Sequence, residues 1–78
     1  MIKPEPPIWK AGDPVLITFQ NQTVPGLITL ASWNAASLLL QFVGKLGGHA
    51  NTMRVLLSRR GDYRSIVTDE LVTLQRPK

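Results

Sequence analysis

Short apolar runs with a period of two, separated by turn-forming residues, recur along this chain and restrict it to a small set of β folds. In the first run, Val15, Ile17 and Phe19 alternate with Leu16, Thr18 and Gln20, which is the pattern of a strand with one face buried. Regular spacing of such runs between turns favours a small barrel. The further runs cover residues 24–33, 38–43, 53–58, 62–67 and 71–74.

Two of these segments also carry helix signals. Asn34 could cap a helix that continues through Val43, and Thr52 could cap one that ends at Gly61. Short apolar runs do not distinguish the two structures by periodicity alone. We favour strands, and the helical alternative for residues 34–43 and 52–60 stays open at this point.

The N-terminal segment differs in character from the rest of the chain. Pro4, Pro6 and Pro7 disfavour helix and strand, because proline lacks an N–H donor and restricts the residue before it. We therefore expect residues 1–10 to form a proline-rich extended arm and residues 11–78 to form a single domain.

The residue types that are missing narrow the chemistry. A chain of 78 residues without cysteine and with a single histidine has no disulfide, no cysteine-based zinc site and no multi-histidine metal site. No apolar run reaches the roughly 18–20 residues of a membrane span. We expect a cytoplasmic protein with no cofactor, no metal and no membrane partner, which is stabilised by its core or by self-association.

The order of these segments resembles a known class of folds. "GDPVLITF", "VPGLITL", two further apolar strands and a final "IVTDELVTL" are similar to the SH3-like small barrels, including Tudor-type and KOW-type modules. The resemblance spans about residues 11–75. It implies an all-β, five-stranded SH3-like barrel with a short 3₁₀ turn, supplied by "TDEL", before the last strand.

The plasmid-encoded type II dihydrofolate reductases share part of this pattern. Gly12-Asp13 resembles their Gly-Asp opening, and Gly26 resembles their second-strand glycine. Their active-site run Val-Gln-Ile-Tyr has no counterpart here, because Arg64 and Ser65 separate Tyr63 from the apolar pair that follows. We therefore do not carry over the reductase activity, although a small oligomeric enzyme with a pore remains a third class of function.

The net charge of +4 comes entirely from residues 45–78, which carry seven basic and three acidic side chains. This asymmetry permits binding to nucleic acid or another polyanion. In "SRRGDYR", Gly61 and Asp62 favour a hairpin turn that gathers arginines at one end, although a solvated basic turn is the plainer interpretation. The candidate nucleic-acid-binding residues are Lys45, Arg54, Arg59, Arg60 and Arg64, which would hold phosphates, and Tyr63, which could stack on a base.

No set of residues predicts catalysis. We expect His49 to be a surface histidine, because it lies in a glycine-rich loop where nothing fixes its orientation. Asp69 and Glu70 are adjacent, so on a strand they would face opposite ways. The expected protein is therefore a non-enzymatic binding module with no catalytic residue.

An apolar surplus suggests association. "LITLASW" and "LLLQFV" carry apolar residues on both faces of their strands, and one face of a single-layer barrel should be polar. We expect Trp9 and Trp33 either to cover the barrel ends or to lie at an interface, and we expect a homo-oligomer. The alternative function is a structural or assembly protein that binds a protein partner through these apolar faces.

Overall fold

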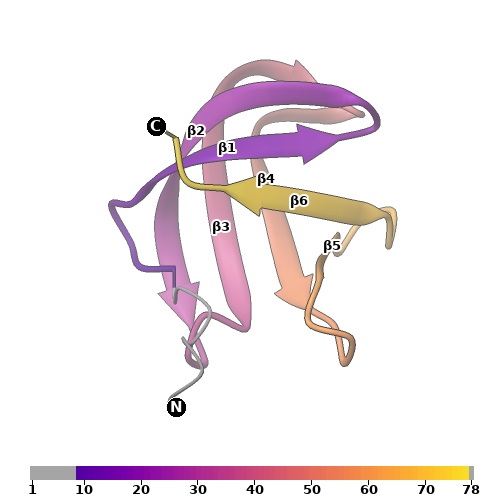
Figure 1. Ribbon diagram of the computed structural model, residues 1–78. Coiled ribbons are helices and arrows are strands. Elements are labelled where there is room, and N and C mark those ends of the chain that lie inside the picture. The colour runs from indigo at the N-terminus through magenta and orange to yellow at the C-terminus, as the bar shows by residue number, and fades with distance from the viewer. Residues whose placement is uncertain (1–8, 78) are drawn as a thin grey trace.

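A computed structural model describes residues 9–77, and this part of the chain forms one closed antiparallel barrel of six strands (Figure 1). Successive strands pair in chain order, and the last strand closes the barrel against the first. The expected arm, residues 1–10, lies outside the described residues except for its last two. The strands are β1 Pro14–Phe19, β2 Gln22–Ser32, β3 Ser37–Leu46, β4 His49–Leu57, β5 Tyr63–Ser65 and β6 Leu71–Gln75.

The all-β prediction is confirmed, and no helix occurs between residues 9 and 77. Both ambiguous segments lie in strands, in β3 and β4, where Leu38 faces Val55 and Leu40 faces Met53 across the pair. These four side chains are almost wholly buried. Pairing satisfies the backbone of both strands and buries one face of each, which outweighs the local helix signals. No helix within the described range could span a membrane, and the cytoplasmic location stays a prediction.

Two details of the expected barrel differ from the structure. The barrel has six strands rather than five, and the expected strand over residues 62–67 is shortened to β5, Tyr63–Ser65. The turn before β6 is not a 3₁₀ turn, because the Asp69 N–H donates to the Ser65 carbonyl oxygen four residues back at 2.8 Å. The Ile66 N–H donates to the carbonyl oxygen of Arg54. The first residue after β5 therefore still forms a backbone hydrogen bond with β4.

The core is built from the inward residues of the strands, as the period of two predicts. Val15, Ile17 and Phe19 of β1 are at most 1% exposed, and Phe42 of β3 is 4% exposed. Both phenylalanines therefore belong to the core. The remaining buried apolar residues are Trp9, Ile28, Ala35, Leu38, Leu40, Leu46, Met53, Val55 and Val72.

Gly26 lies where β1, β2 and β3 approach closely. A Cβ at this position would collide with the main-chain oxygen of Gln41 and would come within 2.8 Å of Cδ1 of Ile17. The absence of a side chain at Gly26 therefore permits the close approach of these strands. The neighbouring register shift between Ile28 and Leu30 bends β2 and lets the sheet curl into a barrel.

Candidate nucleic-acid interface

Two loops meet at the same end of the barrel, and together we call them the basic end: residues 33–36, between β2 and β3, and residues 58–62, between β4 and β5. Ser37 pairs with Ser32 on one side and with Leu56 on the other. The end of β2, the start of β3 and the end of β4 therefore lie side by side. Figure 1 shows both loops beyond these strand ends.

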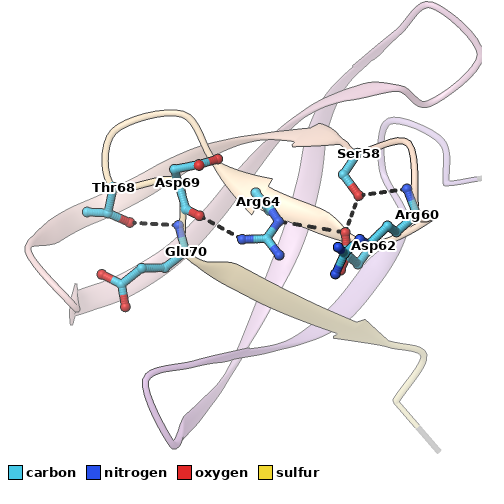
Figure 2. A network of polar contacts seen from close by, with 7 residues as sticks. All are labelled: Ser58, Arg60, Asp62, Arg64, Thr68, Asp69 and Glu70. Carbon is cyan, nitrogen blue, oxygen red and sulfur yellow. Dashed lines mark hydrogen bonds and ion pairs between the residues drawn. The ribbon is translucent and has the colours of Figure 1, made fainter.

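The loop of residues 58–62 is held by contacts within itself (Figure 2). The Ser58 N–H donates to the Asp62 carbonyl oxygen at 2.7 Å, and the Ser58 hydroxyl donates to the Asp62 carboxylate. Gly61 has a φ of 90°, as the predicted turn requires, and its N–H donates to the Ser58 carbonyl oxygen. The side chains of Arg59 and Arg60 take no part in these contacts, and both residues are exposed.

Arg64 is tied down more firmly than the sequence suggests. Its Nη1 donates to the Asp69 carbonyl oxygen at 3.0 Å, and its Nε lies 3.8 Å from Oδ1 of Asp62. Arg64 thus connects the loop of residues 58–62 to the turn before β6 (Figure 2). Asp69 and Glu70 also bring negative charge to this turn, which reduces the local positive potential. Arg64 mainly holds the loop in position.

The loop of residues 33–36 has an unusual backbone. Trp33, Asn34 and Ala35 have φ values of 54°, 55° and 67°, so three successive non-glycine residues are left-handed. This conformation costs about 1–2 kcal/mol per residue for an ordinary side chain and persists only where surrounding contacts enforce it. Trp33 is 77% exposed at this loop.

Contacts from the neighbouring strands hold this backbone in place. Ala35 is buried, and its carbonyl oxygen accepts a hydrogen bond from the Tyr63 hydroxyl at 2.7 Å. The carbonyl oxygen of Ala36 accepts from the Leu57 N–H at 2.8 Å. Burial raises the pKa of Tyr63. With its hydroxyl engaged and its ring half-buried, Tyr63 supports the loop, and Trp33 is the exposed aromatic at the basic end.

The other predicted residues lie elsewhere. Arg54 is exposed on the outer face of β4, diagonally across from Arg64. Lys45 is at the far end of β3, so it lies at the opposite end of the barrel from the basic end. Trp9 is 6% exposed and covers the core, with the Arg76 guanidinium 4.6 Å from its ring centroid. The interface prediction for the tryptophans therefore depends on Trp33.

The expectation of a surface His49 is wrong. His49 is 8% exposed, its Nδ1 lies 3.1 Å from the Leu46 carbonyl oxygen, and its Nε2 lies 2.8 Å from the Ser65 hydroxyl. Its ring packs edge-on against Phe19. The local sequence carries no signal for this burial. Ser65 and Phe19 are distant from His49 in the sequence and contact it only because the strands close into a barrel. The pair is closed off from solvent, so it fills the core rather than forming an accessible reactive site.

The described residues form no metal centre, and comparison with known proteins identifies no relative from which a function could be inferred. Residues 9–77 contain no group of three or more His, Cys, Asp or Glu side chains that could hold a metal ion. Comparison with protein-family models, with curated proteins and with solved structures finds no match to this chain.

Proposed function

We propose that this chain is a non-enzymatic SH3-like barrel, of the Tudor or KOW kind, that binds single-stranded nucleic acid at its basic end. One observation carries the proposal: the exposed residue Trp33 lies at the same barrel end as Arg59 and Arg60. Among the described residues, neither arginine is in an ion pair. A stacking surface beside free cations suits a single strand, whose bases are available for stacking.

The spacing of the two loops supports this proposal. β3 lies between β2 and β4, so the end of β2, which leads into Trp33, and the end of β4, which leads into the loop of residues 58–62, are two strand spacings apart, or roughly 10 Å. A single strand that crosses the barrel end can stack one base on Trp33 and place nearby phosphates on Arg59 and Arg60. A guanidinium group can bind two oxygens of one phosphate. The phosphates of the nucleic-acid backbone are the same in every sequence, so these contacts do not depend on sequence. The expected binding is therefore electrostatic and tolerant of sequence.

The remaining candidates take supporting roles in the proposal. Tyr63 and Arg64 hold the two loops, and Arg54 adds positive charge on the adjoining face of β4. Lys45, at the other end of the barrel, is not expected to contact the same strand. An enzymatic function gains no support, because the buried His49–Ser65 pair is inaccessible to a substrate.

A salt titration with a labelled short single-stranded oligonucleotide tests the proposal by fluorescence anisotropy. Each phosphate contact contributes about 0.7 to the slope of log K against log salt concentration. The Arg59→Ala/Arg60→Ala double variant should therefore lower the slope by about 1.4. Trp33→Ala should weaken binding about 5- to 150-fold, the loss of one stacked base.

Lys45→Ala is the matched control, because it also removes a positive charge but acts at the opposite end. Its slope should equal that of the unchanged protein. Absence of binding at low salt would overturn the proposal. The same would follow from a double variant whose slope fell no further than that of Lys45→Ala.

A further inference from the structure

A long segment of this chain carries no charge at all. Residues 14–44 contain no Asp, Glu, Lys, Arg or His, although the whole chain has a net charge of +4. This segment comprises β1, β2 and most of β3. The outer surface of β1, of β2 and of β3 as far as Gly44 is therefore free of charge, and Lys45 lies near the end of β3.

The outer surface of β2 and β3 is also apolar. Leu30 pairs with Leu39, and Leu27 pairs with Gln41, so these side chains share the outward face of the sheet. Leu27 and Leu30 are 47% and 52% exposed, and Val43 is 95% exposed. We call this surface the uncharged face; it consists of Pro25, Leu27, Leu30, Leu39, Gln41 and Val43.

The uncharged face is hollowed at the end that carries Pro25 and Val43. Regular pairing of β2 with β3 ends at Gly26 and Phe42, and β3 shifts register against β4 between Gln41 and Lys45. Residues of these two paired strands border a cleft of about 360 Å³, which is lined by Pro25, Gly26, Leu27, Gln41, Phe42 and Val43. A prominent apolar side chain thus stands directly beside an apolar hollow.

We propose that the uncharged face is the interface of a two-fold symmetric dimer of this chain, in which Val43 of each copy enters the cleft of the other. Interface cores are depleted of charged residues, and in homodimers they are more apolar than other interfaces. A two-fold axis brings the same patch of both copies together, so a projection beside a hollow is self-complementary.

The charge distribution favours a second copy of this chain as the partner that binds the uncharged face. Two copies that each carry +4 repel one another wherever their cationic surfaces meet, as at Arg54, Arg59 and Arg60. On the uncharged face the cations are confined to the edges, where Arg54 pairs with Leu39 across β3 and β4 and Lys45 follows Val43 along β3, so two copies can approach there with less repulsion. A polyanion, by contrast, has nothing to bind there, so this interface is separate from the proposed nucleic-acid site and does not depend on it.

Analytical ultracentrifugation over a concentration series tests the proposal. The unchanged protein should sediment as a dimer that dissociates on dilution. Val43→Asp should raise the dissociation constant at least about 30-fold, because the interface would bury an unpaired charge. Its circular dichroism and melting temperature at low concentration should match those of the unchanged monomer, since Val43 is 95% exposed in the single barrel.

Val67→Asp is the matched control. Val67 is 76% exposed in the turn before β6, away from the uncharged face, and the substitution changes the net charge by the same amount. Both variants lower the repulsion between copies, so dissociation of Val43→Asp alone would have a local cause. Val43→Lys should dissociate as well, with the opposite charge. A monomer at every concentration, or a Val43→Asp dimer as stable as that of Val67→Asp, would overturn the proposal.

Discussion

Removing the Ser65 hydroxyl tests whether the buried His49–Ser65 pair holds the end of the barrel closed. The Leu46 carbonyl oxygen beside His49 Nδ1 can only accept a hydrogen bond. In the neutral ring, Nδ1 therefore carries the proton and Nε2 accepts from the Ser65 hydroxyl at 2.8 Å. Ser65 Oγ in turn accepts from the Val67 N–H at 3.2 Å. The Ser65→Ala variant leaves Nε2 buried with no donor.

The expected loss follows from this geometry. An unpaired acceptor in a buried site costs about 1–3 kcal/mol, whereas the Val67 N–H lies near the surface and can donate to water instead. For Ser65→Ala we therefore expect the free energy of unfolding to fall by about 2 kcal/mol. In a domain of this size, that loss lowers the melting temperature by roughly 8–16 °C. Urea unfolding followed by circular dichroism, together with a thermal melt, measures both quantities.

Thr68→Ala is the control in the same turn. The Thr68 hydroxyl accepts from the Glu70 N–H at 3.4 Å in an exposed position, so its removal should change stability by less than about 0.5 kcal/mol. If Ser65→Ala lost no more than Thr68→Ala, solvent would have to reach His49 Nε2. The account of a sealed pair would then be refuted.

Two further changes probe the packing of the barrel. Gly26→Ala should lower the free energy of unfolding by about 1–3 kcal/mol, because the new Cβ would press on Gln41 and Ile17. A urea titration measures this loss, and an unchanged midpoint would contradict the close approach. Burial raises the pKa of Tyr63 above about 10, so the folded state holds the phenolic proton more tightly than the unfolded chain. The corresponding stability should be complete below about pH 10 and should be lost as pH rises through the folded pKa. Tyr63→Phe should lack this part of the alkaline decline, and identical declines in both proteins would contradict the prediction.

The strand periodicity predicted most of the architecture. Val15, Ile17 and Phe19 point inward, as their alternation requires. The sequence did not decide between helix and strand for residues 34–43 and 52–60, because local signals were present for both. Partner strands supplied by other parts of the chain decided it, since pairing satisfies backbone groups that a short isolated helix leaves to solvent.

The candidate site was predicted only in part. Gly61 and Asp62 indicated the turn that presents Arg59 and Arg60, and this turn is local enough to be recognised from a few residues. The engagement of Tyr63 with Ala35, 28 residues away, has no local signal. The same holds for the burial of His49, whose partner Ser65 lies 16 residues further along the chain.

The amino-acid sequence by itself determined which residues alternate, where the chain turns and that all net charge falls in residues 45–78. These properties depend on neighbours within a few positions. The tertiary structure decided which side chains meet: Trp33 at the same barrel end as Arg59, a histidine from a glycine-rich loop sealed in the core, and an uncharged outer face on β2 and β3. The reason is that closing a barrel fixes the register of strands distant in sequence, and register places each side chain inside or outside.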